Sequence, residues 1–232
     1  LQSIKYSESS NILKIYTEAF GLKSYIIRGL RKSKSRTKAS LFQHLSLLEL
    51  VVYDKDKKDI QNIKEVRPAY IFRDIPFNIN KSSIILFMNE LINKSIREEE
   101  SNPEMFEFIY GSIVRLDKLA QGEFNFHLVF IILFTKYLGF YPMHFGKQDL
   151  PFLDLQEGLF QKSRPSHSDF LSGENSSFIR QILVNGFEIA DQLEIPARNR
   201  KEMLNSMLQY YRLHLPDFSP MKSPAVLHSV FH

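Results

Sequence analysis

The first third of the chain alternates hydrophobic and polar residues with a period close to two, up to about Phe77. This period is typical of strands that bury one face. Turn-forming residues separate the segments, among them Ala19-Phe20-Gly21 and the run from Asp54 to Asp59. The pattern predicts five strands, at residues 1–5, 11–17, 22–28, 45–53 and 60–67. Five short strands in sequence indicate a small closed or nearly closed barrel, and the OB-fold is the commonest five-stranded one.

After Pro76 the hydrophobic residues recur at helical spacing. Asn102 and Pro103 have the form of an N-cap followed by a first-turn proline, so a second helix should begin there. Residues 125–138 are apolar on nearly all sides and predict a central buried helix, which Gly139 ends. Further helices are expected over residues 174–192, from residue 196, and over residues 224–231, whereas residues 143–171 should be an irregular surface excursion.

The expected fold class is therefore α+β, with an N-terminal five-stranded OB-fold barrel followed by an all-helical C-terminal domain. We expect the first domain to span residues 1–78 and the second to span residues 79–232.

A run of positive charge follows the third predicted strand. It contains Arg31, Lys32, Lys34, Arg36 and Lys38. No acidic residue lies between Glu18 and Glu49, and small polar residues separate the charges. Such a loop can contact phosphates and release their counterions, so the run predicts binding to a polyanion. The alternative is a solvated surface loop that binds nothing.

Charge is distributed unevenly between the two parts of the chain. Residues 1–80 contain 15 Lys and Arg against 8 Asp and Glu, a net charge of +7, whereas residues 81–232 contain 15 against 18, a net charge of −3. This asymmetry favours nucleic-acid binding by the first domain. The chain has no cysteine, which excludes disulfides, thiol nucleophiles and cysteine zinc sites. No apolar run is long enough to span a membrane, and we expect cytoplasmic residence.

Two lysine–tyrosine pairs lie at alternate positions on neighbouring predicted strands. Lys14 and Tyr16 share one face of the second strand, and Lys23 and Tyr25 share one face of the third. We expect these side chains on an outward barrel face, where tyrosines stack on bases and lysines contact phosphates. The alternative is that they are ordinary surface residues.

No motif for catalysis is present. The sequence lacks a glycine-rich phosphate loop, H-E-x-x-H and G-x-S-x-G, and its histidines are scattered. The spacing of Asp54, Asp56 and Asp59 is better explained by a solvated hairpin tip than by a cation loop, because lysines are interleaved with them. We expect no enzymatic activity, no metal site and no cofactor.

Four segments resemble, in the right order, the RecO family of bacterial recombination mediators. They are TEAFGLKSYIIRGLRKSKS, NELINKSIREEESNPEMFEFIYGSIVRLD, LGFYP and MKSPAVLHSVF. The resemblance implies an N-terminal OB-fold, a helical C-terminal domain and work in DNA repair. It implies binding of single- and double-stranded DNA, annealing of complementary strands, and binding of the tail of single-strand-binding protein. With RecR, such proteins help RecA displace that protein. The matching DNA-binding positions are Arg28 and the run from Arg31 to Lys38.

The chain departs from the family in three places. Some members hold a four-cysteine zinc site after the position of LGFYP, which a chain without cysteine cannot form. In some members arginines at the start of the central helix engage the tail of single-strand-binding protein, and the matching positions here are Leu128 and Val129. The family's first strand usually begins some residues earlier, so residues are expected to precede Leu1.

A receptor for that tail needs an apolar pocket beside a cation, because the tail is acidic and ends in an apolar residue with a free carboxylate. Arg115 and Lys118 lie three residues apart on one helix face and flank Leu116 and Leu119. We expect the pocket at the junction with the aromatic-rich helix from Phe124; two solvated cations are the alternative.

Two other functions remain open. The barrel could bind a protein instead of DNA, which would make the chain an adaptor, and salt dependence of DNA binding separates the two. A metal-dependent nuclease is the second rival, although the sequence shows no convergent carboxylates or histidines.

Overall fold

A computed structural model describes residues 1–6, 10–28, 41–53, 58–97, 99–146, 150–190 and 192–231. Two predictions concern residues outside this described part of the chain: the basic run from Arg31 to Lys38, and the hairpin tip at residues 54–57.

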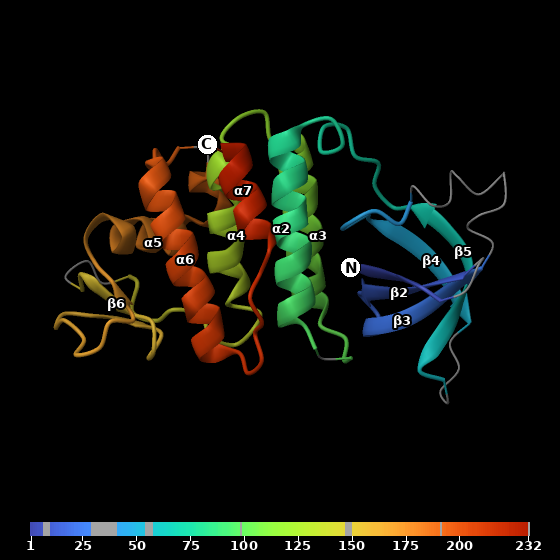
Figure 1. Ribbon diagram of the computed structural model, residues 1–232, viewed down its shortest axis with the longest axis horizontal. Helices are drawn as coiled ribbons and strands as arrows, with labels where there is room; N and C mark the ends of the chain where they lie inside the picture. The colour runs from blue at the N-terminus through green and yellow to red at the C-terminus, as the bar shows by residue number, and fades with distance from the viewer. Residues whose placement is uncertain are drawn as a thin grey trace. The chain divides into compact units, whose positions relative to one another are not determined.

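The N-terminal strands form one five-stranded sheet with the order β1-β2-β3-β5-β4 (Figure 1). Its strands are β1 (Gln2–Lys5), β2 (Ser10–Thr17), β3 (Gly21–Arg28), β4 (Leu48–Tyr53) and β5 (Ile60–Pro68). Each lies within three residues of its predicted bounds. All neighbouring pairs are antiparallel except β3 and β5, which run parallel. Among the described residues no pairing joins β1 to β4, so the sheet is open at this seam and is not a closed barrel.

The helices begin close to the predicted positions, but those expected over residues 125–138 and 174–192 end earlier, at Phe134 and Asn185. They are α2 (Ile79–Ser95), α3 (Pro103–Lys118), α4 (Phe126–Phe134), α5 (Gly173–Asn185), α6 (Ala197–His214) and α7 (Ser223–Phe231), with short 3-10 turns η2 (Glu123–Asn125) and η3 (Gly186–Ile189). The side-chain Oδ1 of Asn102 accepts a hydrogen bond from the N–H of Met105, at 3.0 Å, which confirms the predicted N-cap.

Helix α4 is the core of the second part of the chain. It packs against α2, α5 and α6, and Leu128, Val129 and Phe130 are fully buried (Figure 1). A nine-residue helix that is apolar on all sides can only be stable when other helices surround it. The chain then turns at Gly139, whose φ of 86° is unfavourable for residues with a side chain.

Residues 143–171 are not irregular as expected, and the second part of the chain is not all-helical. This segment contains a three-stranded sheet with the order β7-β6-β8, made of β6 (Phe152–Asp154), β7 (Leu159–Gln161) and β8 (Phe170–Leu171). The buried carboxylate of Asp154 forms the turn after β6, because it accepts hydrogen bonds from the N–H groups of Gln156 and Glu157. Strands of two or three residues are too short to show a period in sequence.

Helix α7 is fixed to α2 by one carboxylate. Glu90 accepts hydrogen bonds from the N–H groups of Lys222 and Ser223 and from the hydroxyl of Ser223, at 2.6–2.9 Å. Burial alone would raise the pKa of Glu90, but these hydrogen bonds outweigh it and the pKa is lowered. A negative charge at a helix N-terminus is favourable, and the carboxylate of Glu90 lies at this position because it binds Lys222 and Ser223, where α7 begins.

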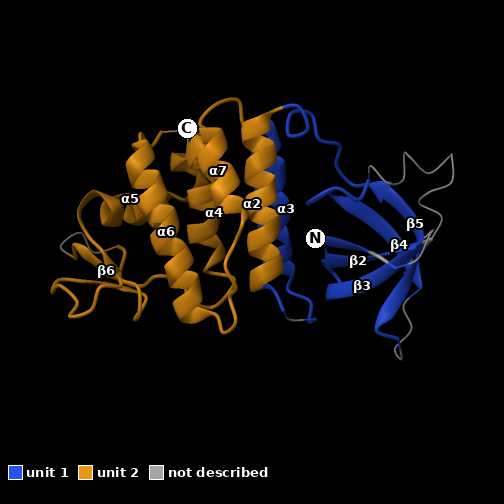
Figure 2. Ribbon diagram, in the orientation of Figure 1, with its two compact units in different colours: residues 1–77, 96–118 blue, residues 78–95, 119–232 orange. Residues whose placement is uncertain are grey.

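The described chain divides into two compact units (Figure 2). Unit 1 contains residues 1–77 and 96–118, and unit 2 contains residues 78–95 and 119–232. Helix α3 thus belongs with the sheet, whereas the predicted domain boundary at residue 78 assigns it to the second domain. Within unit 1, the carbonyl of Glu100 lies so close to Gly21 that a Cβ there would be 2.3 Å from it, and the hydroxyl of Ser101 donates to the carbonyl of Glu18.

Candidate nucleic-acid interface

The register between β2 and β3 determines which side chains share a face. Leu13 lies opposite Tyr25 and Ile15 lies opposite Lys23, whereas Lys14 lies opposite Ser24. Directly opposed residues in an antiparallel pair point to the same side of the sheet. Lys23 and Tyr25 therefore share a face with Leu13 and Ile15, and Lys14 points to the other side. The expectation that both lysine–tyrosine pairs lie on one outward face is wrong.

Tyr25 lies in the core of unit 1. Its side chain is 1% exposed, and Leu13 and Ile27 on the same face are equally enclosed at 3% and 5%. The expectation that bases stack on Tyr25 is therefore corrected. The physical reason is that a tyrosine ring is largely apolar and fills a core position as readily as a surface one.

Tyr16 is half-buried and packs within unit 1. Its ring centroid lies 6.2 Å from that of Phe106 on α3, and its hydroxyl donates to the carbonyl of Asn102 over 3.4 Å. Its role as a base-stacking residue stays a prediction. These contacts leave less of the ring for a base than the sequence alone indicates.

The two lysines differ in their surroundings. Lys14 is exposed on β2, where its ammonium group can meet a phosphate. Lys23 is half-buried, and its Nζ lies 4.6 Å from the ring centroid of Phe20 in the turn between β2 and β3. Both remain candidates for contact with DNA, although on opposite faces of the sheet.

Strand β3 leads directly into the predicted DNA-binding loop. The backbone of Arg28 pairs with Ser10 at the end of the β2–β3 ladder. The run from Arg31 to Lys38 follows within three residues, outside the described residues, and its contact with DNA stays a prediction.

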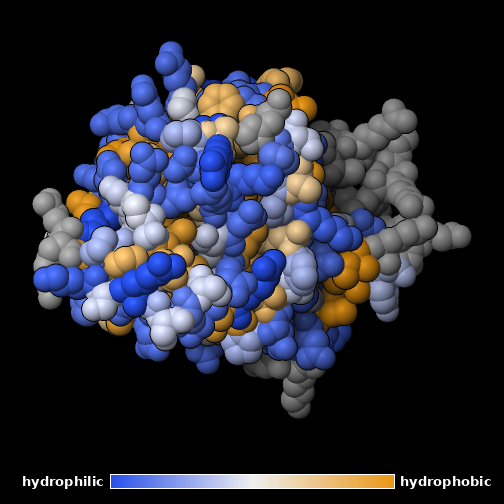
Figure 3. Space-filling view, turned by 60° about the vertical axis from the view of Figure 1, so that its left-hand side comes forward, coloured by the Kyte–Doolittle hydropathy of each residue, from blue (hydrophilic) through white to orange (hydrophobic). Residues whose placement is uncertain are grey.

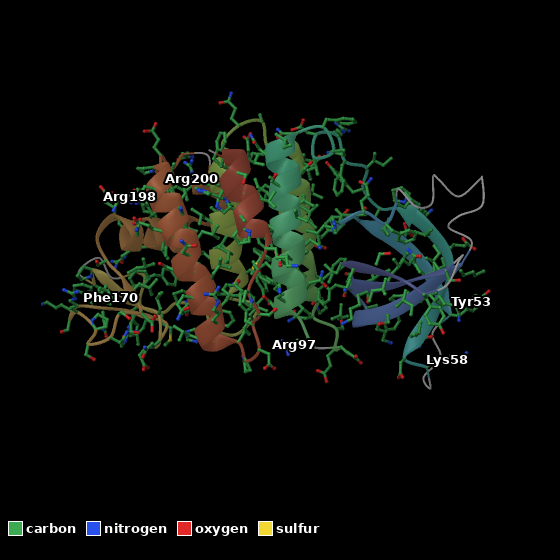
Figure 4. The ribbon with its side chains drawn as sticks, in the orientation of Figure 1. Tyr53, Lys58, Arg97, Phe170, Arg198 and Arg200 are labelled. Atoms are coloured by element: carbon green, nitrogen blue, oxygen red, sulfur yellow. The ribbon has the colours of Figure 1, made fainter. Side chains whose placement is uncertain are left out.

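The most exposed aromatic residues of the sheet strands and their ends were not predicted as part of the site. Tyr6 follows β1 and is 65% exposed, and Tyr53 ends β4 and is 53% exposed. Figure 4 labels Tyr53, at the end of β4, and Lys58, two residues before β5. Each tyrosine adjoins a predicted turn, which is the signal that could have identified them. Arg67 on β5 forms an ion pair with Glu49 on β4. This pairing neutralises part of the positive charge of the two strands, whereas the basic run contains no acidic residue.

Replacing Tyr25 with alanine is expected to destabilise unit 1 by about 3 kcal/mol, because the substitution leaves a cavity in its core. DNA affinity of the folded protein should not change. Chemical denaturation and fluorescence anisotropy measure the two effects. Lys14→Ala is the matched control, since it should leave stability unchanged within about 0.5 kcal/mol and weaken DNA binding. A Tyr25→Ala protein that is as stable as the parent but has lost DNA affinity would show that Tyr25 binds DNA and is not a core residue.

The residues predicted to bind a protein tail lie at the end of α3. Arg115 and Lys118 are both exposed, whereas Leu116 between them is fully buried and cannot be the floor of an open pocket. Leu119 and Phe124 belong to unit 2. The assignment of the two cations to a tail-binding site stays a prediction.

Two kinds of feature are absent from the described residues. No group of three or more His, Asp or Glu side chains in the described ranges is arranged to hold a metal ion. Among the same residues no helix is both long and apolar enough to cross a membrane.

The chain matches two family models that together cover most of its length. The model described as "Recombination protein O N terminal" matches residues 1–72, and the one described as "Recombination protein O C terminal" matches residues 76–224. These matches, together with the five-stranded sheet of unit 1, define a recombination protein with an N-terminal OB-fold.

Curated relatives identify the family. "DNA repair protein RecO" of Azobacteroides pseudotrichonymphae is 36% identical over all of this chain and 96% of its own length. The proteins of the same name from Phocaeicola vulgatus and Flavobacterium psychrophilum are 36% and 35% identical, with the same coverage. The chain belongs to the RecO family, which confirms the resemblance in sequence.

Proposed function

We propose that this protein is a non-enzymatic mediator of homologous recombination that binds single- and double-stranded DNA and anneals complementary strands. With RecR it would help load RecA onto DNA that single-strand-binding protein covers. Membership of the RecO family supports this proposal. The observation that carries it is the concentration of positive charge in residues 1–80, where the net charge is +7.

The proposed contacts with DNA come from the sheet and the loop after β3. They are Lys14, Tyr16, Lys23, Arg28, Arg31, Lys32, Lys34, Arg36 and Lys38. Each cation that meets a phosphate releases condensed counterions, and this release supplies affinity that does not depend on base sequence. If contacts are made mainly to its backbone, the base edges of a bound single strand stay available for pairing.

Annealing follows from the same contacts. Two strands repel each other through their phosphates, and a protein that neutralises both sets lowers this barrier while bases remain free to pair. No covalent step is needed, so neither a catalytic residue nor a cofactor is part of the proposal.

Annealing of two complementary oligonucleotides should be faster in the presence of the protein and should require neither ATP nor a divalent ion. A fluorophore and a quencher on the two strands report the rate. The matched control is the protein in which the five cations from Arg31 to Lys38 are alanine, which should not accelerate annealing. Equal rates with and without the parent protein would contradict the proposal.

We also propose that the acidic tail of single-strand-binding protein is a partner, with Arg115 and Lys118 as candidate cations for it. A protein with this role would act in the cytoplasm and associate with the bacterial nucleoid. Arg115→Glu with Lys118→Glu should abolish binding of a tail peptide and leave direct DNA binding intact. A double variant that binds the peptide as the parent does would place the receptor elsewhere.

A further inference from the structure

Helix α3 of unit 1 has one face that is exposed along its whole length (Figure 2). With about 3.6 residues per turn, its exposed positions after Pro103 all lie within about 40° of a single line along the helix. The buried residues Ile109, Ile113 and Leu116 lie on the opposite side. The exposed residues form what we call the charged stripe: Glu104, Glu107, Gly111, Arg115 and Lys118.

The charges of the charged stripe are symmetric in position and opposite in sign. Glu104 and Lys118 each lie seven residues from Gly111, and Glu107 and Arg115 each lie four residues from it. The helix dipole favours acidic residues at the start of a helix and basic residues at its end, but it does not require this equal spacing. Reversed about Gly111, the stripe presents the opposite charge at every position, so it is complementary to an antiparallel copy of itself.

Gly111 lies where two such copies would cross. A Cβ at this position would meet no side chain and no other segment of the described chain within 4 Å. Glycine in an exposed helix interior is less favourable than alanine, and the described fold of one copy shows no contact that requires it. The distance between two packed helices depends on the side chains at their contact, so a glycine there permits a close approach.

The margins of the charged stripe are apolar. Phe108 and Val114 lie three residues before and after Gly111, and both are half-buried. An antiparallel crossing would bring each of them to the contact from both copies, which adds apolar burial to the charge pairs. On the face that Figure 3 shows, hydrophobic residues form small separate areas among hydrophilic ones, so no broad apolar patch there offers a stronger contact.

A second copy suits the charged stripe better than a partner of one charge sign. Glu104, Glu107 and Lys118 form no ion pair within the described ranges, so their charges are available to another molecule. A nucleic acid laid along the stripe would meet the two glutamates, and a short acidic peptide would use only the basic half. An antiparallel copy satisfies both halves at once.

We propose that two copies of this chain associate through the charged stripe, with their α3 helices antiparallel and crossing at Gly111. Glu104 of each copy then faces Lys118 of the other, and Glu107 faces Arg115. By two-fold symmetry each pair occurs twice. One crossing of two helices buries less than the roughly 1,200 Å² of a standard interface, so the dimer is weak and depends on concentration.

The inference goes beyond the proposed function and does not depend on it, because association needs no DNA. It does affect the tail-binding proposal. Arg115 and Lys118 are the candidate cations for an acidic tail, so a bound tail would compete with the second copy.

The test is sedimentation equilibrium of the full chain, free of DNA, at protein concentrations between about 1 μM and 1 mM. The average mass should rise with concentration from the 27.2 kDa of one chain towards twice that value. Added salt should weaken the association, because exposed ion pairs are screened. A mass that stays that of a single chain at about 1 mM would overturn the proposal.

Charge-reversed variants test the pairing of the two halves. Glu104→Lys with Glu107→Lys makes the stripe positive throughout, and Arg115→Glu with Lys118→Glu makes it negative throughout. Each variant alone should associate at least about tenfold more weakly than the parent, because like charges face each other. An equimolar mixture of the two should associate at least as strongly as the parent, which a misfolded variant could not do. A mixture that associates no better than either variant alone would overturn the proposal.

The matched control reverses two charges that lie just before the helix. Glu99→Lys with Glu100→Lys makes the same change in net charge at exposed positions outside α3. This variant should associate as the parent does. If it loses association as fully as Glu104→Lys with Glu107→Lys, net charge and not the charged stripe determines the mass, and the proposal fails.

Gly111→Gln tests the crossing point without changing any charge. Glutamine is a good helix former, so the melting temperature should be unchanged or raised, while its longer side chain keeps the helices apart. Association should weaken at least about tenfold. Association equal to that of the parent would overturn the crossing at Gly111. DNA affinity of the same preparations keeps the proposals apart, since a parent protein that binds DNA but stays monomeric removes this inference alone, and one that dimerises without binding DNA removes the proposed function alone.

Discussion

Replacing Arg31, Lys32, Lys34, Arg36 and Lys38 together with alanine is expected to lower affinity for single-stranded DNA by about a hundredfold or more at low salt. The reason is that each cation that meets a phosphate contributes counterion release, and five such contacts are lost at once. The loop carries no predicted core residue, so the melting temperature should stay within a few degrees of the parent value. Anisotropy with a labelled oligonucleotide at about 50 mM salt measures the loss.

The control for this experiment must remove the same amount of charge elsewhere. Five exposed cations of unit 2 serve this purpose: Lys136, Lys162, Arg164, Arg212 and Lys222. Their replacement with alanine should reduce DNA affinity much less, because they lie outside the basic part of the chain. If both five-residue variants lose affinity equally, net charge and not the loop determines binding.

Asp117→Ala is expected to destabilise unit 1 by about 3 kcal/mol, because four donors, among them the N–H of buried Ile75, lose the carboxylate that accepts their hydrogen bonds. The carboxylate of Asp117 is 3% exposed and accepts hydrogen bonds from the hydroxyl of Tyr70 and from three successive N–H groups, those of Arg73, Asp74 and Ile75. These bonds fix the loop after β5 to the end of α3. Urea denaturation followed by circular dichroism measures the loss.

The same carboxylate should make stability depend on pH. Burial alone would raise the pKa of Asp117, but the hydrogen bonds outweigh it and the pKa is lowered. A lowered pKa contributes stability that is present above the unfolded value of about 3.9 and is lost as pH falls through the folded value. Asp117→Asn, which cannot ionise, is the control. The stability difference between parent and variant should shrink as the pH is lowered below about 4. A difference that stays constant with pH would contradict the assignment.

The sequence predicted most of the fold because its signals are local. The five N-terminal strands follow from a period of two, and Asn102 marks a helix start through capping. The helix end predicted at Gly139 was placed too late, because α4 ends at Phe134 and the chain continues in turns to Gly139. The sheet β6–β8 could not be predicted, since its strands have two or three residues and are stabilised by a turn at Asp154. The grouping of α3 with the sheet depends on tertiary contacts that no periodicity records.

The candidate site was predicted less completely, because register decides which face of a strand is buried. The alternation of hydrophobic and polar residues shows that Lys23 and Tyr25 share a face of β3. It does not show that Leu13 of β2 lies on the same face or that Tyr25 is buried there. A cavity beside Arg200, lined by residues of α4, α6 and α7, was missed for a related reason. Its residues come from three helices, and His127 appears in sequence only as one polar residue in an apolar helix.

The central claim is that the basic loop grips the phosphate backbone, and the salt dependence of DNA binding tests it most directly. A labelled single strand should be titrated with the parent protein at salt concentrations between about 50 and 200 mM. Five phosphate contacts predict a slope of about −3.5 in a plot of log K against log salt concentration, so affinity should fall about a hundredfold over this range. An affinity that does not change with salt would contradict the claim and favour the alternative in which the N-terminal sheet binds a protein.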